Sequence, residues 1–311
     1  MLDYHLHLWP HSQSEAPLDI QQIADYCDRA NSVGVTEVAL TEHLFRFTQS
    51  ESIVAGLFDD ERPELRESME QYWLYHARTD LDDYVECALA AKAAGLPVVV
   101  GLEVDYYQGR MDQVARLLNG YPFDVLLGSV HWIGAWRFDD LSDEISMAEW
   151  SVRDVDRCWL AYTEAMEELA ATGACDVLAH PDLVKAAGYR PRHPEEWWDR
   201  IAEAASHFGL VAELSSAGWK KNCDEQYPAE PLLERFAARG VGFTTASDAH
   251  RLEHVADRAN ELRILLASVG VTELQAFRDR VRHPVSVTDE PTSPVPPTSP
   301  VPPGAANSKG R

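Results

Sequence analysis

Short runs of aliphatic and β-branched residues recur along the whole chain, and each pair of runs is separated by enough residues for a helix. Runs of about four to eight such residues, bounded by polar or turn-forming residues, indicate buried strands. Seven segments fit this description and are predicted to be strands: 1–8, 37–40, 98–102, 125–130, 176–179, 211–214 and 242–245.

Stretches with apolar residues at helical spacing lie between these strands, most clearly at 20–33, 81–94, 155–171 and 231–239. Glycine is favoured directly after a helix because it readily adopts a left-handed backbone. Several stretches end in this way, at Gly34, Gly95, Gly173, Gly209 and Gly240. Strand and helix therefore alternate, and we expect an α/β fold, a distorted seven-stranded (β/α)7 TIM-like barrel.

The composition changes sharply near the end of the sequence. Residues 289–311 consist mostly of Pro, Ser, Thr, Val, Gly and Ala, and a Pro-Thr-Ser-Pro-Val-Pro-Pro motif nearly repeats. Such a segment buries too little apolar surface to offset the entropy lost on ordering. We therefore predict one domain over residues 1–288 and a disordered tail over 289–311. Two inserts after strands, 45–79 and 132–154, are expected to form lids.

Charge and cysteine content exclude several classes of partner. The chain has 27 Lys and Arg against 51 Asp and Glu, a net charge of −24, which disfavours nucleic acid and anionic membrane surfaces. Its five cysteines are widely spaced and form no Cys-x-x-Cys pair, which argues against disulfides and thiolate–zinc clusters. No signal peptide and no long apolar span is recognisable, so a cytoplasmic location is expected.

Residues that can ligate metal ions follow six of the seven predicted strands. In parallel β/α barrels the carboxyl ends of the strands form the face that carries the active site. The first strand ends in His5-Leu6-His7, and strand alternation places both imidazoles on one face. A single histidine at a strand end is more often structural, but a full set at one face predicts a metal centre. Its candidate ligands are His5, His7, His11, His43, Glu103, His131, His180, Asp248 and His250.

The ligand types limit which ions would bind. Imidazole and carboxylate without thiolate suit zinc, iron or manganese. Nine ligands exceed the roughly four that one such ion takes, and a carboxylate can be shared between ions. We therefore expect three divalent transition-metal ions.

The order of these motifs resembles the PHP (polymerase and histidinol phosphatase) family, and specifically its histidinol-phosphate phosphatase branch. The resemblance extends from Asp3 to about Arg263. It rests on six ordered motifs: His5-x-His7, Thr41-Glu42-His43, Gly101-Leu102-Glu103, Gly128-Ser129-Val130-His131-Trp132, Ala179-His180-Pro181-Asp182 and Ser247-Asp248-Ala249-His250.

The resemblance also implies how the ligands are shared among the ions. One ion would be held by His5, His7, Glu103 and Asp248, a second by Glu103, His131 and His180, and a third by His11, His43 and His250. The sequence departs from the family pattern in two places. The spacing before His11 is shorter than usual, and Glu42 stands where aspartate is commoner.

The function implied by the resemblance is that of a metal-dependent phosphoric monoester hydrolase, namely an L-histidinol-phosphate phosphatase of histidine biosynthesis. Asp248 is the candidate catalytic residue, which would orient the attacking water and accept its proton. Contacts to a small phosphorylated substrate are expected from cations after the fifth and sixth strands, at Lys185, Arg190 and Lys220. A flat leaving group would suit the indoles of Trp132, Trp136 and Trp219, and Asp105 is expected to hydrogen-bond a ligating imidazole.

Three alternatives remain at this point. The chain could be a PHP phosphoesterase for another small phosphate, such as a nucleotide or a sugar phosphate. It could be an amidohydrolase-type enzyme acting on amides or lactones, although Glu103 on the third strand fits that class less well. It could also be a non-catalytic accessory module, which the complete ligand set disfavours.

Overall fold

The computed structural model describes residues 1–13, 17–59 and 61–287, and the predicted tail lies outside these residues. Seven parallel strands form one sheet in sequence order, as predicted. The strands are β1 (Leu2–Leu6), β2 (Glu37–Leu40), β3 (Val98–Asp105), β4 (Val125–Ser129), β5 (Val177–Leu178), β6 (Val211–Ser215) and β7 (Phe243–Ala246). Every residue of β1 and of β3 to β7 is buried, which is why these segments appear as almost continuous apolar runs in the sequence.

The sheet curves until its last strand meets its first, so the barrel is nearly closed. Leu6 forms an isolated parallel bridge with Ala249, and the His7 amide donates to the Ala249 carbonyl at 2.8 Å. The buried carboxylate of Asp3 reinforces this seam by accepting from the Ser247 amide at 2.8 Å and its hydroxyl at 2.7 Å. The seam therefore places the end of β1 directly beside the segment that follows β7.

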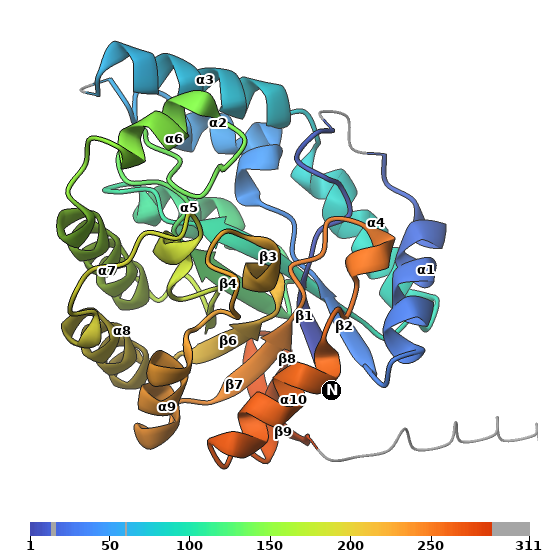
Figure 1. Ribbon diagram of the computed structural model, residues 1–311. Coiled ribbons are helices and arrows are strands. Elements are labelled where there is room, and N and C mark those ends of the chain that lie inside the picture. Colours follow the sequence, from blue (N-terminus) through green and yellow to red (C-terminus); the bar gives the residue numbers. More distant parts are fainter. Residues whose placement is uncertain (14–16, 60, 288–311) are drawn as a thin grey trace, which may run out of the picture.

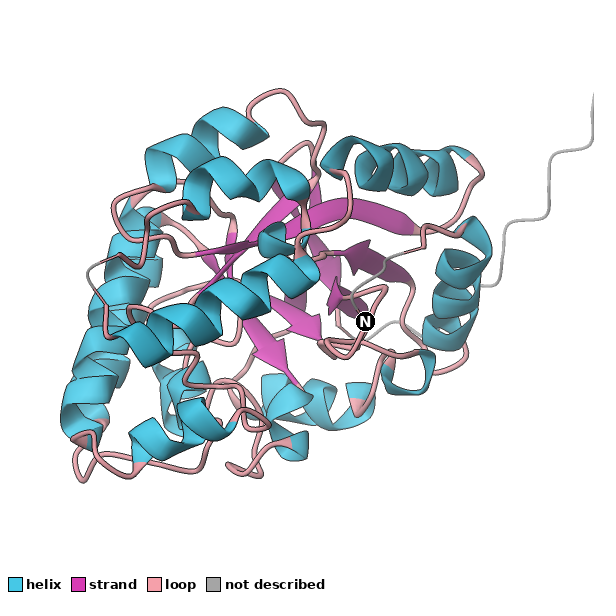
Figure 2. Cartoon of the chain, turned by 90° about the horizontal axis from the view of Figure 1, so that it is seen from above, coloured by secondary structure: helices cyan, strands magenta, loops and turns pink. Residues whose placement is uncertain are grey.

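Helices surround the barrel, as the view from above shows (Figure 2). In α1 the buried residues are Ile23, Tyr26, Cys27 and Ala30, so one stripe faces the sheet. Asp19 caps this helix by accepting from the Gln21 amide. The surrounding helices are α1 (Ile20–Asn31), α4 (Leu81–Ala93), α5 (Met111–Leu118), α7 (Val155–Ala171), α8 (Glu195–Phe208), α9 (Glu230–Ala238) and α10 (Ala259–Ser268). All five glycines predicted to end helices have positive φ.

The two inserts lie together on one side of the barrel, at the top of Figure 1. The first contains η1 (Leu44–Arg46), η2 (Thr48–Ser50), α2 (Glu51–Val54) and α3 (Pro63–His76), and the second contains α6 (Glu144–Trp150). Three further short 3-10 helices follow the later strands: η3 (Leu183–Lys185), η4 (Ala217–Lys220) and η5 (Leu252–His254). The inserts thus cover the end of the barrel where the strands finish.

A two-stranded antiparallel sheet, β8 (Glu273–Arg278) and β9 (Val281–Ser286), was not among the predicted strands. It packs against the opposite end of the barrel, where the strands begin. The Phe277 amide donates to the Tyr4 hydroxyl, and Arg280 forms an ion pair with Asp176, the residue before β5. This hairpin therefore leaves the other end of the barrel for the functional site. None of the helices in the described part of the chain has the length and apolar character needed to cross a membrane.

Candidate metal centre

Glu103 lies at the middle of the predicted ligand set. Its Oε2 atom is 3.2 Å from His5 Nε2 and 2.6 Å from His43 Nδ1. Its Oε1 atom is 3.3 Å from His131 Nε2 and 3.0 Å from His180 Nε2. One fully buried carboxylate is therefore surrounded by imidazoles that follow or belong to four different strands.

A second group of rings lies beside this carboxylate. His7 stacks on His43 with ring centroids 4.2 Å apart and on His250 at 4.1 Å, and its Nε2 atom is 3.3 Å from Asp248 Oδ1. Ligand atoms of His7, His43 and His250 lie within 4.8 Å of one another. The ring of His11 is next to this group, 4.5 Å from that of His250. The fold thus brings the ligand atoms of eight predicted residues into groups that could hold a metal ion, and the ring of the ninth, His11, lies beside them.

Two of these residues have unusual backbone conformations. His180 has a φ of 27° and Asp248 a φ of 49°, in the left-handed region that residues with a side chain rarely adopt. Each lies two residues after the end of a short strand, β5 or β7, where the chain turns toward the barrel mouth. Such strain costs on the order of 1–3 kcal/mol and is typical of functional sites. The rest of the fold therefore holds these two side chains in place.

Carboxylates outside the predicted ligand set contact two of the imidazoles at hydrogen-bond distance and lie near a third. His5 Nδ1 is 2.8 Å from Glu213 Oε2, and His131 Nδ1 is 2.6 Å from Asp105 Oδ1. Histidines that bind metals usually hydrogen-bond a carboxylate or carbonyl through the second ring nitrogen. Glu42 lies 3.5 Å from His7 Nδ1 and also accepts from the amides of the first loop. The partner predicted at Asp105 is present, whereas Glu213 was missed because the sixth strand offered no ligand at its end.

The charges suit cation binding. Burial works against the ionised form of Glu103, but the nearby histidine cations hold the pKa of this carboxyl well below its usual value. Burial lowers the pKa of His250 to about 3, so this ring is neutral. The pKa of His131 is raised to about 10, because the charge of Glu103 and the bond to Asp105 outweigh burial. A metal ion bound there would have to displace that proton.

Many buried polar atoms of this cluster have no hydrogen-bond partner in the described part of the chain. They include Nε2 of His5, both ring nitrogens of His7 and of His43, Oε2 of Glu103 and Nε2 of His250. Buried polar groups are normally satisfied, since leaving one unpaired costs about 1–3 kcal/mol. Donor atoms of the right chemistry that all point at one another fit divalent cations. The residues present could therefore hold metal ions.

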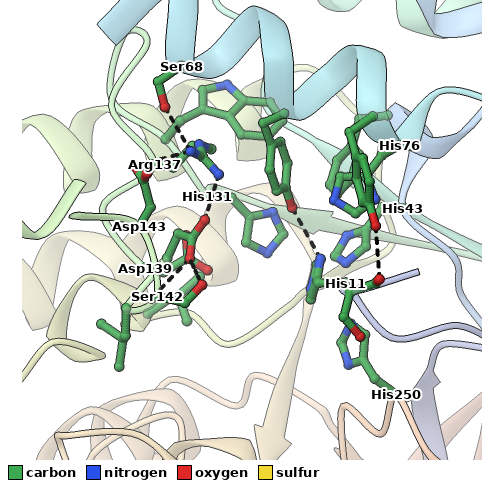
Figure 3. A pocket seen from close by; sticks show the side chains of 18 of the residues that line it. His11, His43, Ser68, His76, His131, Arg137, Asp139, Ser142, Asp143 and His250 are labelled. Carbon is green, nitrogen blue, oxygen red and sulfur yellow. Dashed lines mark hydrogen bonds and ion pairs between the residues drawn. The ribbon is translucent and has the colours of Figure 1, made fainter. Parts of the chain in front are cut away.

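The cluster forms the floor of a cavity of about 1170 Å³, and both inserts supply walls. Figure 3 shows His11, His43 and His250 on one side and Arg137 and Asp139 on the other, with His131 between them. The Asp139 side chain forms no hydrogen bond or ion pair with the described residues, and desolvation raises the pKa of its carboxyl. Neither Arg137 nor Asp139 was predicted, because lid residues follow no recognisable spacing.

The predicted phosphate contacts do not all lie at this cavity. Lys220 lines it and pairs with Asp257 at 2.8 Å. Lys185 is completely buried and is held by Asp182 at 2.7 Å and Glu225 at 2.6 Å. Neither Lys185 nor Arg190 is among the described residues that line the cavity, and Arg190 also pairs with Glu225 at 2.6 Å. The expectation that these two cations contact the substrate therefore needs correction, because carboxylates of the segments after β5 and β6 already bind them.

The three tryptophans predicted to contact a flat leaving group do not all line the cavity. Trp132 lines the cavity, whereas Trp136 is fully buried and donates to the Ser146 carbonyl. Trp219 lies under the guanidinium of Arg258, outside the cavity lining. His76, which the sequence did not distinguish from an ordinary core histidine, forms part of the cavity wall. Only one of the three indoles is thus placed to stack on a ligand.

Comparison with known proteins finds similar sequences over more than half of the chain. The model of the PHP domain family matches residues 3–217. A protein of Deinococcus radiodurans named "Probable histidinol-phosphatase" is 34% identical over 175 residues, which cover 55% of this chain and 66% of that protein. A Schizosaccharomyces pombe protein of the same name is 23% identical over 206 residues, 62% of this chain and 67% of its own. The chain thus aligns with about two thirds of the length of these relatives.

A solved structure shows the same fold. The histidinol phosphate phosphatase of Lactococcus lactis, crystallised with zinc, L-histidinol and phosphate, superposes with a TM-score of 0.66 at 19% identity. The superposition covers 91% of this chain and 98% of that one. Since the family model matches well over half of the sequence, including the residues that carry five of the six ligand motifs, this chain belongs to the PHP domain family.

Proposed function

We propose that this chain is a metal-dependent phosphoric monoester hydrolase that releases phosphate from L-histidinol phosphate. The observation that carries the proposal is the cluster around Glu103, where imidazoles and carboxylates converge with unpaired donor atoms. The D. radiodurans and S. pombe relatives and the L. lactis structure support a phosphatase of this specificity.

The proposed ligand sets follow the family pattern. His5, His7, Glu103 and Asp248 would hold one ion, Glu103, His131 and His180 a second, and His11, His43 and His250 a third. Zinc is the first ion to test, because the L. lactis structure contains it. Ions bound there would lower the pKa of a coordinated water and neutralise charge on the phosphoryl oxygens.

The side chains of the site supply orientation and proton transfer. Asp248 faces the cavity with 17% of its side chain exposed, next to His5 and His7. From this position its carboxylate would orient the attacking water and accept a proton from it. Lys220 lies on the cavity wall and would bind a phosphoryl oxygen in exchange for its contact with Asp257.

The carboxylate of Asp139, which has no partner among the described residues, favours a substrate whose leaving group carries a positive charge. A carboxylate in a partly desolvated wall without a partner is costly, and an ammonium ion would remove that cost. Histidinol carries an ammonium group and a flat imidazole, for which Trp132 offers an aromatic surface. Nucleotide and sugar phosphates carry no such ammonium group.

The first experiment measures phosphate release from histidinol phosphate, a nucleotide, a sugar phosphate and p-nitrophenyl phosphate by zinc-loaded protein of known metal content. We expect histidinol phosphate to give the highest kcat/KM. Release hundreds of times less efficient than from another ester would reject the substrate and keep the reaction class. Absence of bound metal together with full activity in chelator would reject the reaction class as well.

The role of Asp139 predicts a change in specificity. In Asp139→Asn, KM for histidinol phosphate should rise about tenfold or more, because a charge-assisted contact contributes roughly 1.5–3 kcal/mol. The kcat/KM for p-nitrophenyl phosphate, which has no ammonium group, is the internal control and should stay near wild type. Equal losses on both substrates would contradict recognition of a cation by Asp139.

A further inference from the structure

The two inserts are joined above the metal centre by Arg137. Its guanidinium donates to Ser68 of α3 at 2.9 Å and lies over the ring of Tyr72, 4.3 Å from the ring centroid. Asp140 and Asp143 pair with the same guanidinium at 2.5 Å and 3.1 Å, and only 8% of the arginine side chain is exposed. Figure 3 shows Arg137 between Ser68 and Asp143 at the cavity wall. Arg137 of the second insert therefore holds the ring of Tyr72, which belongs to α3 of the first insert.

The hydroxyl of Tyr72 reaches a candidate metal ligand. It lies 3.2 Å from Nδ1 of His11, which belongs to the loop after β1. The His11 ring in turn lies 4.5 Å from His250 and 5.1 Å from His43, measured between centroids. His11 thus has an outer partner on one edge and the histidine cluster on another.

The same arrangement recurs in other candidate ligands. The Nδ1 atoms of His5 and His131 contact outer carboxylates, while their Nε2 atoms point at Glu103. In His250, Nδ1 is 3.2 Å from the Asp248 carbonyl, and Nε2 has no partner among the described residues. An outer contact of this kind fixes the tautomer and turns the other nitrogen toward the ion.

We infer that Tyr72 is a positioning residue for His11. Its hydroxyl oxygen accepts a hydrogen bond from Nδ1–H of His11, which leaves Nε2 of that ring free to bind an ion beside His43 and His250. The inference rests on the proposed metal-dependent function. His11 depends on such a contact more than the other ligands do, because it lies in an exposed loop rather than at the end of a strand. Arg137 would act on His11 indirectly, by holding the ring of Tyr72 in place.

Zinc binding by Tyr72→Phe tests this role, since that change removes the hydroxyl and keeps the ring. Protein is dialysed against buffers of graded free zinc, and bound zinc per chain is measured by elemental analysis. We expect the weakest-bound ion to be lost at roughly 10- to 100-fold higher free zinc than in wild type, the usual effect of removing an outer partner. The remaining ions should bind as in wild type.

Tyr75→Phe is the matched control, because its hydroxyl holds the same loop through the Ser12 carbonyl at 2.9 Å. It should bind every ion as wild type does. The double variant His11→Ala/Tyr72→Phe should bind no more weakly than His11→Ala alone, because both changes remove one interaction. Unchanged zinc binding in Tyr72→Phe, or an equal loss in Tyr75→Phe, would overturn the inference. Wild-type protein that takes up none of zinc, iron and manganese would instead overturn the proposed function on which the inference rests.

Discussion

At the scale of single residues, the groups around a histidine determine its pKa and therefore its charge. His131 is held between two carboxylates, and its pKa is raised to about 10 by their charge against the effect of burial. His76 is also buried, but after burial the largest effect on its pKa comes from the cation Arg46, and its Nδ1 atom has no partner among the described residues. The two rings therefore differ in charge at neutral pH, and this difference comes from the charged groups that the fold places around each ring.

His76 predicts that stability depends on pH. Burial, aided by Arg46, lowers the pKa of His76 to about 3, against 6.5 in the unfolded chain. Below pH 6.5 His76 is protonated in the unfolded state but stays neutral in the folded state, so the free energy of unfolding falls as the pH falls toward 3. This ring should account for about 2 kcal/mol of the stability lost between pH 7 and pH 5.

The measurement is urea unfolding of wild type and His76→Gln at both pH values, in chelator so that metal release does not contribute. The variant should lose less stability than wild type over this interval. Equal losses in the two proteins would show that His76 does not remain neutral in the folded state.

At the scale of elements, close packing between strands and helices keeps the ligands in register. Gly128 of β4 lies against Cys175 and Leu169, and a side chain at this position would find no room. Three residues further along the chain is His131, which faces Glu103. The close packing of Gly128 against Cys175 and Leu169 therefore helps to fix the position of His131 at the end of β4.

Gly128→Ala tests this packing. The added Cβ would lie 2.5 Å from Cys175 Sγ and 2.9 Å from its Cβ, so a strand or helix must shift. Overpacking of this kind destabilises a protein by about 1–3 kcal/mol. Chemical denaturation should show a loss of this size, and the double variant Gly128→Ala/Cys175→Ala should recover part of it. Wild-type stability in the single variant would mean that β4 has space behind it.

At the scale of the whole molecule, the candidate ligands join parts of the chain that are far apart in sequence. Residues from the ends of six strands meet at Glu103 or at its neighbours. The seam between β1 and β7 lies directly below this cluster, because His7 and Ala249 are hydrogen-bonded. Ions bound at the cluster would therefore stabilise the closed barrel as well as the site.

Removal of metal should lower the melting temperature. Each ion stabilises the folded state by about 2.7 kcal/mol when its free concentration is a hundred times its dissociation constant. Calorimetry of zinc-loaded protein with and without chelator measures the change. Glu103→Gln is the control, since loss of the central carboxylate should reduce the effect of chelator. A melting temperature that is the same in zinc and in chelator would contradict metal binding by the folded chain.

The sequence predicted much of the fold, because strands that are buried on both faces consist of consecutive apolar residues. The seven strands appear as apolar runs, and glycines such as Gly34 and Gly209 end helices where the backbone turns left-handed. The hairpin of β8 and β9 was missed, since polar residues at exposed positions such as Glu273, Arg278 and Arg282 interrupt the apolar pattern. Its pairing depends on contacts with the base of the barrel rather than on its own composition.

By itself the sequence determined which residues could be ligands and that they lie at one end of the barrel, because both follow from local spacing and strand direction. Only the tertiary structure decided what each side chain meets. It buried Lys185 between Asp182 and Glu225, and it left the carboxylate of Asp139 in the cavity wall without a partner among the described residues. It also brought Tyr72 to His11 across 61 residues of chain. Such contacts depend on distances between segments remote in sequence, which no local pattern records.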